Sequence, residues 1–218
     1  MINVWLLPVL GFLMGSIPFG YLIVKFSEGR DIRGEGSGNI GAANVTRVVG
    51  RGAGLVTLAL DAGKGWLAVW LTGLVTGGNT TWMAAVALAA ILGHLFTPWL
   101  KFKGGKGVAT GAGAFLAISP AAVGGAFVVW LLIVGIWRYV SLGSMAAAAV
   151  LPPLTYAWIL YSTEFAPPTL VSLFTTMAAL LIIWKHRDNL RRIAAGTEAK
   201  FTLRGNRGGN GPDEDGEE

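Results

Sequence analysis

Residues 101–110 combine the side chains and backbone best suited to binding a phosphate. They read Lys-Phe-Lys-Gly-Gly-Lys-Gly-Val-Ala-Thr and follow directly after an apolar run. Lysine ammonium groups supply point charges, and glycines let backbone N–H groups approach an anion closely. We expect Lys106 to neutralise a phosphate, the backbone around Gly104 and Gly105 to cradle it, and Lys103 to belong to the same binding loop.

The spacing of this stretch excludes a nucleotide-binding P-loop. That motif needs Gly-x-x-x-x-Gly-Lys followed by Ser or Thr, whereas Lys106 is followed by Gly107. ATP chemistry is therefore unsupported, and the expected ligand is a different phosphate.

A second polar stretch, residues 34–47, alternates glycines with hydrogen-bonding side chains. Ser37, Asn39 and Asn44 lie among glycines that include Gly41, and Arg47 closes the stretch. Glycine alone would fit a flexible linker between helices. The interleaved hydroxyl and amide groups favour a loop that wraps a polar ligand.

Two further polar segments lie beside later apolar runs. In residues 138–144 the arginine is typical of a membrane anchor and Ser144 of a helix start, so this segment alone predicts no more than a turn. The basic segment 185–198 would ordinarily bind lipid headgroups. If a helix continues through this segment, His186 and Asn189, three residues apart, share one face of it. Binding of lipid headgroups does not explain this pairing of an imidazole with an amide.

Three ionisable residues fall inside apolar runs. Asp61 and Lys64 are three residues apart. Intramembrane charges are functional candidates by default, but this spacing equally permits an ion pair with no other role. For His94, a hydrogen bond between packed helices is favoured over a ligand role.

The composition places these groups in an integral membrane protein. Hydrophobic residues make up 53% of the 218, charged residues make up 13%, and the mean hydropathy is +0.59. These values are far from those of a soluble domain. Most of the apolar runs approach the roughly 20 residues that span hydrocarbon, and they cover 4–24, 53–76, 82–100, 107–118, 121–137, 142–162 and 168–184.

The positions of Lys and Arg predict the orientation of the chain. Loops 77–81, 119–120 and 163–167 contain none, so the positive-inside rule puts the remaining connections in the cytoplasm. A re-entrant 107–118 would put Arg138 and the basic C-terminal segment outside. We therefore predict seven transmembrane helices, with the N-terminus outside and the C-terminus cytoplasmic. Residues 1–204 then form one all-α membrane domain, and 205–218 is expected to be a disordered acidic tail.

The composition also limits the chemistry. With no cysteine and two histidines, the chain is expected to have neither a Cys nucleophile nor a metal centre, and no cofactor is predicted. Its net charge of +5 suits anionic membrane lipid better than nucleic acid, because the basic residues lie at span ends. No segment indicates an obligatory protein partner.

At these residues the sequence resembles the bacterial membrane glycerol-3-phosphate acyltransferases that take their acyl group from acyl-phosphate. The resemblance covers nearly the whole chain except the acidic tail. Two positions depart from the family pattern: Ala43 replaces the usual Thr, and Asp188 the usual Glu. The resemblance rests on 15–20, on 36–42 with Asn44 and Arg47, on Gly93 and His94 with Phe96 and Pro98, on 102–110, on 138–141, and on His186 and Arg187 with Asn189.

The resemblance implies an enzyme of the bacterial inner membrane with its active site facing the cytoplasm. Its substrates would be acyl-phosphate and glycerol 3-phosphate, and its products 1-acyl-glycerol 3-phosphate and phosphate, in the first step of phospholipid synthesis. The candidate catalytic residues are Lys106, His186, Asn189, Ser37 and Arg47, and the candidate substrate-binding residues are Asn39, Gly41, Asn44, Lys103, Gly104, Gly105, Ser141 and Ser144.

Acyl-phosphate is a mixed anhydride with a good leaving group, so positioning and charge stabilisation should suffice for catalysis. We predict direct attack by the glycerol hydroxyl without an acyl-enzyme, because no serine has an evident His–carboxylate pair. His186 as a general base is the competing mechanism. A phosphate carrier is the alternative from another class, since Gly- and Lys-rich loops and intramembrane charges would serve it too.

Overall fold

All regular structure is helical in residues 3–162 and 168–201, the part of the chain that the computed structural model describes. The tail expected at 205–218 lies outside this part. The α-helices are α1 (Leu7–Ser16), α2 (Phe19–Glu28), α3 (Ala42–Val48), α4 (Arg51–Thr76), α5 (Thr80–Leu95), α6 (Val108–Leu116), α7 (Pro120–Trp137), α8 (Val140–Ser162), α9 (Pro168–Lys185) and α10 (Arg187–Ala194), with 3-10 turns η1 (Val4–Leu6), η2 (Ile32–Gly34) and η3 (Pro98–Leu100).

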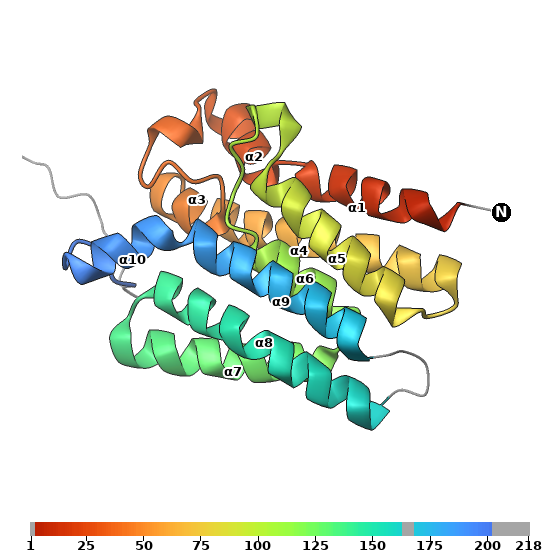
Figure 1. Cartoon of the computed structure of the whole chain (residues 1–218). Helices are drawn as coiled ribbons and strands as arrows, with labels where there is room; N and C mark the ends of the chain where they lie inside the picture. Colours follow the sequence, from red (N-terminus) through yellow and green to blue (C-terminus); the bar gives the residue numbers. More distant parts are fainter. Residues whose placement is uncertain (1–2, 163–167, 202–218) are drawn as a thin grey trace, which may run out of the picture.

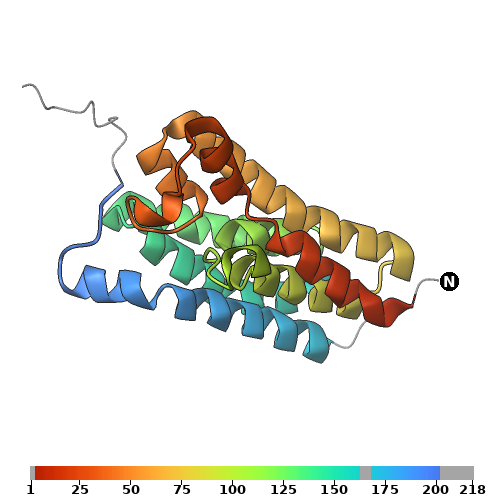
Figure 2. The same ribbon diagram turned by 90° about the horizontal axis from the view of Figure 1, so that it is seen from above.

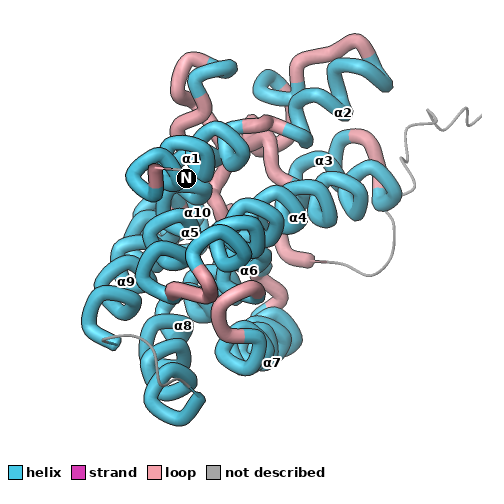
Figure 3. The backbone as a smooth tube through the Cα atoms, turned by 90° about the vertical axis from the view of Figure 1, so that its right-hand side faces the viewer, coloured by secondary structure: helices cyan, strands magenta, loops and turns pink. Residues whose placement is uncertain are grey.

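The long helices lie side by side in one bundle, with the N-terminus at one end and α3 and α10 at the other (Figure 1). α1 packs on α5, α4 on α6, α7 on α8, and α8 on α9. Seen from above, α4 (orange) and α9 (blue) run along opposite edges of the bundle (Figure 2). The end-on view places α1 and α2 on the edge opposite α7 and α8 (Figure 3). α5 lies in the middle, and nearly all of its residues from Met83 to Leu95 are buried.

The span lengths match most of the sequence-based expectations. In the described part, five helical segments are long and apolar enough to cross a membrane, and α9 with α10 makes a sixth if the pair, bent by 48°, counts as one span. The exception is α6, which has only 9 residues. At 1.5 Å per residue it is about 14 Å long, less than half of the hydrocarbon core. The seven-crossing arrangement and the sides of the two termini therefore remain predictions.

The helix α6 follows an extended segment and ends shortly before α7 begins at Pro120. After α5 the chain runs out to η3, then returns along the bundle before α6 begins at Val108 (Figure 1). Two glycines let α6 press against α4: a Cβ on Gly113 would meet the Ala62 carbonyl oxygen, and a Cβ on Gly65 would meet that of Thr110. Small residues at such crossings are typical of membrane helix packing.

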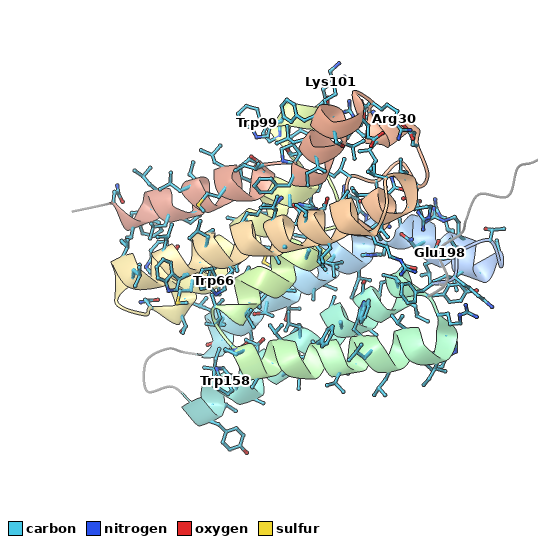
Figure 4. All side chains as sticks on the ribbon, turned by 180° about the vertical axis from the view of Figure 1, so that it is seen from behind. Arg30, Trp66, Trp99, Lys101, Trp158 and Glu198 are labelled. Atoms are coloured by element: carbon cyan, nitrogen blue, oxygen red, sulfur yellow. The ribbon has the colours of Figure 1, made fainter. Side chains whose placement is uncertain are left out.

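Basic segments far apart in the sequence lie at one end of the bundle. The amide of Phe201 donates to the Arg138 carbonyl at 2.6 Å, and Arg138 Nε donates back to the Phe201 carbonyl at 3.1 Å. The turn between α7 and α8 thus lies beside the chain that follows α10. Glu198 lies at this end and Trp158 toward the other (Figure 4). This arrangement agrees with the expectation that the basic clusters share one side.

Candidate active site

The loop between α2 and α3 is organised by one buried amide. Asn44 is only 1% exposed. Its Nδ2 donates to the carbonyls of Glu35 at 3.0 Å and Asn39 at 2.8 Å, and its Oδ1 accepts from the Ser37 amide at 2.8 Å. These bonds occupy the side chain within the loop. Asn44, expected to contact substrate, therefore shapes the loop that presents its neighbours.

The other residues expected in this loop lie nearer the surface. Ser37 and Arg47 are exposed, and Asn39 and Gly41 are half-buried. The Asn39 Oδ1 accepts from the Gly41 amide at 2.8 Å, which forms the tight turn that leads into α3. Arg47 NH1 lies 3.4 Å from Asn44 Oδ1, so the cation is anchored to the same amide.

The glycines of the second loop use their amides within the protein. The Gly104 amide donates to the Leu95 carbonyl at 3.2 Å, and the Gly105 amide donates to the His94 carbonyl at 3.0 Å. The last carbonyls of a helix have no partner within it, and these two amides satisfy those of α5. The expected phosphate cradle from the Gly104 and Gly105 amides is therefore absent in this arrangement. What the loop presents instead is Lys106.

Lys106 is the first member of a chain of polar contacts between segments distant in sequence. Its Nζ donates to Asn189 Oδ1. Asn189 Nδ2 in turn donates to Glu198 Oε1 at 2.6 Å, and Arg192 Nε donates to Glu198 Oε2 at 2.8 Å. Ser141, at the start of α8, also donates to Glu198 Oε1, at 2.7 Å. Glu198 is therefore the group on which three side chains converge, one from α8 and two from α10, although no sequence motif pointed to it.

His186 lies at a break in the helix, not within a continuous one. α9 ends at Lys185, α10 begins at Arg187, and the two are bent by 48°. His186 and Asn189 are both buried, but of the two only Asn189 lines a hollow at this end of the bundle. His186 Nδ1 lies 2.8 Å from the Ile182 carbonyl oxygen, which can only accept. This contact assigns the proton to Nδ1 in the neutral ring and leaves Nε2 as an acceptor.

The two serines of α8 have different surroundings. Ser141 joins the Glu198 contacts described above. Ser144 is 4% exposed, and its Oγ donates to the Val140 carbonyl one turn earlier at 2.8 Å. Its hydroxyl proton is thus used within the helix, and only its oxygen can receive a bond from substrate.

Two hollows open at this end of the bundle and share Gly38. The first, about 170 Å³, lies between the α2–α3 loop and α10, and brings together four expected residues. Its lining is Ser37, Gly38, Asn39, Lys106, Lys185, Arg187, Asp188, Asn189 and Arg192. The second, about 460 Å³, has Lys103 and Gly104 on one side and the η2 turn on the other. Its lining is Asp31, Arg33, Gly34, Gly38, Lys103 and Gly104.

The electrostatics of the first hollow suit an anion. Burial, partly opposed by the Glu198 carboxylate, lowers the pKa of Lys106 to about 8. Burial acts to raise the pKa of Glu198, but the hydrogen bonds from Ser141, Asn189 and Arg192 outweigh it and keep that pKa below its ordinary value. Lys106 is thus charged at neutral pH beside an ionised carboxylate and two arginines.

The site holds cations, amides, hydroxyls and the carboxylates of Glu198 and Asp188. Within 3–162 and 168–201, no three His, Asp or Glu side chains are grouped as metal ligands.

Of the residues expected from the sequence, Ser37, Asn39, Lys106 and Asn189 line one hollow, and Lys103 and Gly104 line the other. Glu198 and Arg192 were missed. The one acidic residue between Thr197 and Lys200, in an otherwise basic segment, was the available signal.

Comparison with known proteins yields one consistent group of relatives. The sequence family described as Glycerol-3-phosphate acyltransferase matches residues 5–196. The glycerol-3-phosphate acyltransferase of Trichlorobacter lovleyi is 48% identical over 190 residues, which are 87% of this chain and 93% of that protein. The one from Geobacter sulfurreducens is 46% identical over 201 residues, 92% of this chain and 99% of that protein.

Solved structures agree. The crystal structure of PlsY (YgiH), an integral membrane glycerol 3-phosphate acyltransferase, in its glycerol 3-phosphate form has a TM-score of 0.80 and 36% identity to this chain, covering 91% of this chain and 96% of that one. Its lysophosphatidic acid form has a TM-score of 0.78 and 34% identity, with 91% and 95% covered.

Proposed function

This chain belongs to the glycerol-3-phosphate acyltransferase family, whose members are integral membrane enzymes that convert glycerol 3-phosphate to lysophosphatidic acid, and we propose that its acyl donor is acyl-phosphate. We also propose that the transfer is direct, without an acyl-enzyme. The basic end of the bundle then faces the cytoplasm, at the inner membrane of a bacterium.

The pair of adjoining hollows is the observation that carries this proposal. Each substrate brings one phosphate group, and each hollow has a lysine of the 101–107 loop in its wall, Lys106 in one and Lys103 in the other. We place glycerol 3-phosphate beside Lys106 and Asn189, and the donor phosphate beside Lys103. The shared Gly38 lets the two substrates meet with no side chain between them.

In this mechanism the protein positions the reactants and stabilises negative charge. The glycerol hydroxyl oxygen forms a bond to the acyl carbonyl carbon, and the bond from that carbon to the phosphate oxygen breaks. The hydroxyl proton passes to a phosphate oxygen of the substrate, and phosphate leaves with the bonding electron pair. Lys106 and Arg47 stabilise the negative charge that develops, which is often the largest single contribution to such a rate. Ser37 and Asn189 orient the glycerol phosphate, and the Nε2 of His186 accepts a hydrogen bond from it.

Purified protein in detergent tests the choice of donor. With glycerol 3-phosphate present, we expect acyl-phosphate to give equimolar lysophosphatidic acid and phosphate, and acyl-coenzyme A or acyl carrier protein to give none. Turnover with either thioester at the same rate would contradict the proposal.

Incubation with acyl-phosphate alone tests direct transfer, because recovery of an acylated peptide containing Ser37, Ser141 or Ser144 would show an acyl-enzyme.

The rate is expected to fall at alkaline pH as Lys106 loses its proton. A lysine is charged below its pKa, so the ammonium is present at pH 7 and is lost as the pH rises through about 8. The pH profile of kcat/KM, corrected for spontaneous hydrolysis of acyl-phosphate, measures this for the free enzyme. Lys106→Arg keeps its charge at every pH used. This variant should be slower but should lack the alkaline decline, and a decline that persists in it belongs to another group.

A further inference from the structure

A charged cluster inside the bundle lies directly behind the 101–107 loop. Lys64 on α4 and Asp61, one turn before it, are 5% and 2% exposed, and His94 near the end of α5 is 4% exposed. Lys64 Nζ lies 2.6 Å from Asp61 Oδ1, 2.9 Å from His94 Nδ1 and 2.7 Å from the carbonyl oxygen of Ile17. None of these side chains lines either hollow of the active site.

The contacts of Lys64 account for all of its hydrogen-bonding capacity. An ammonium has three N–H donors, and the three acceptors are a carboxylate, an imidazole nitrogen and a backbone carbonyl. No donor remains for a substrate. The expected ion pair with Asp61 is present, but it accounts for only one of the three bonds. The other two join α4 to the break between α1 and α2 and to the end of α5.

The Lys64 bond also sets the orientation of the His94 ring. Because an ammonium can only donate, Nδ1 of His94 accepts and the ring proton of the neutral imidazole lies on Nε2. The ring then faces Gly105 so closely that a Cβ there would meet Nε2, Cε1 and Cδ2. Gly105 also donates its amide to the His94 carbonyl at 3.0 Å. Both the side chain and the backbone of His94 therefore support the turn that immediately precedes Lys106.

A neighbouring pair of contacts ties the outer part of the loop to the same break. Thr97, which is fully buried, donates its Oγ1 to the Ser16 carbonyl at 2.6 Å. Trp99 Nε1 donates to Ser16 Oγ at 2.9 Å. The break after Ser16 frees carbonyl oxygens that a continuous helix would use, and Lys64 and Thr97 bind two of them in succession.

We propose that Lys64 and His94 are positioning residues, which hold the Gly104–Gly105 turn from inside the membrane and so set the place of Lys106 in the active site. They touch no reacting atom and act through the loop. This inference rests on the proposed role of Lys106. A displacement of about 1 Å in such a group can lower a rate by a factor of about 10².

The test variant removes the cluster without leaving a buried charge. Lys64→Met alone would strand Asp61, whereas Asp61→Leu with Lys64→Met removes both charges at similar volume. Replacing the ion pair itself is often neutral or stabilising, whereas the His94 and Ile17 acceptors lose their donor, so we expect the double variant to fold and to unfold within a few degrees of the wild-type temperature. His94→Gln is the second variant, because its side-chain oxygen can still accept from Lys64 while the ring over Gly105 is lost. Thr72→Val, at a buried site two turns further along α4, is the matched control.

Hydrogen exchange of the 101–107 peptide gives a readout that does not depend on activity. We expect faster exchange at Gly104 and Gly105 in the double variant and in His94→Gln, with α7 and α8 unchanged, and wild-type exchange in Thr72→Val. Turnover should fall about 10²-fold in the double variant through kcat. Wild-type exchange in this peptide, or wild-type kcat in the folded double variant, would overturn the inference.

A mutant cycle with Lys106→Ala separates positioning from general damage. If the cluster acts through Lys106, adding the double substitution to Lys106→Ala should lower the residual rate by less than about threefold, because coupled residues are not additive. An equal 10²-fold loss in both backgrounds would assign the cluster a merely structural role. If Lys106→Ala were itself fully active, the proposed site would fail, and the exchange result would still decide whether the cluster holds the loop.

Discussion

Lys106→Ala is expected to lower kcat/KM for glycerol 3-phosphate by a factor of about 10²–10³, or roughly 2.7–4 kcal/mol of transition-state stabilisation. Lys106 donates to Asn189, and both line the smaller hollow, in which we place the phosphate of glycerol 3-phosphate. Half-buried surroundings weaken solvent screening, so the loss of one preorganised cation has a large effect. Steady-state rates in detergent with acyl-phosphate in excess measure it.

Lys101→Ala is the matched control for this variant. Lys101 belongs to the same loop, but it is exposed and lines neither hollow. Its loss should change kcat/KM by less than about twofold. Comparable losses in Lys101→Ala and Lys106→Ala would mean that the general positive charge of the loop matters and that no particular lysine does. A well-folded Lys106→Ala protein with near-normal turnover would remove Lys106 from the mechanism.

Glu198→Ala is expected to lower kcat by about 10²-fold and to reduce the thermal unfolding temperature by several degrees. Glu198 accepts from Ser141, Asn189 and Arg192 at 2.6–2.8 Å. Hydrogen bonds to a charged group contribute about 1.5–3 kcal/mol each. Without the carboxylate, Asn189 loses the contact that fixes its amide, and with it the defined place of Lys106. Turnover and unfolding of the same preparation should therefore fall together.

Graded substitution distinguishes this explanation from a nonspecific effect. In Glu198→Gln the amide oxygen can still accept from Ser141 and Asn189, while Arg192 loses its ion pair, so the loss should be nearer tenfold. Glu28→Ala is the matched control, because that carboxylate is exposed at the end of α2 and contacts only Arg30, at 3.4 Å. If Glu198→Gln were as impaired as Glu198→Ala, the charge would matter and the geometry at Asn189 would not.

Much of the fold could be predicted because lipid imposes simple constraints on a chain. Runs of about 20 apolar residues correspond to α4, α5, α7, α8 and α9 within a few residues. The run 107–118 corresponds to α6, which begins one residue after the run does but is too short to cross the hydrocarbon core by itself. Gly107 adopts φ 81°, so α6 starts at Val108 and the residues before it run extended beside α5. That return is determined by contacts with α5, which a local pattern does not contain.

For the site, residue types were predictable and partners were not. The polar character of Ser37, Lys106 and Asn189 was evident from their place in the sequence, and all three line one hollow. Asn44 and the Gly104 and Gly105 amides were expected at the substrate from the family resemblance and from their residue types. They bond within the protein because each meets an acceptor or donor brought by the fold.

The amino-acid sequence by itself determined that this protein is a membrane helix bundle and which polar groups it carries. Hydrophobicity and charge are properties of single residues, and the bilayer selects them segment by segment. Only the tertiary structure decided how those groups are used. Lys106 and Asn189 are 83 positions apart, and Lys64 and Ile17 are 47 apart. Each hydrogen-bonding group has few possible bonds, and which acceptor takes them depends on the packing of helices that no local stretch of sequence specifies.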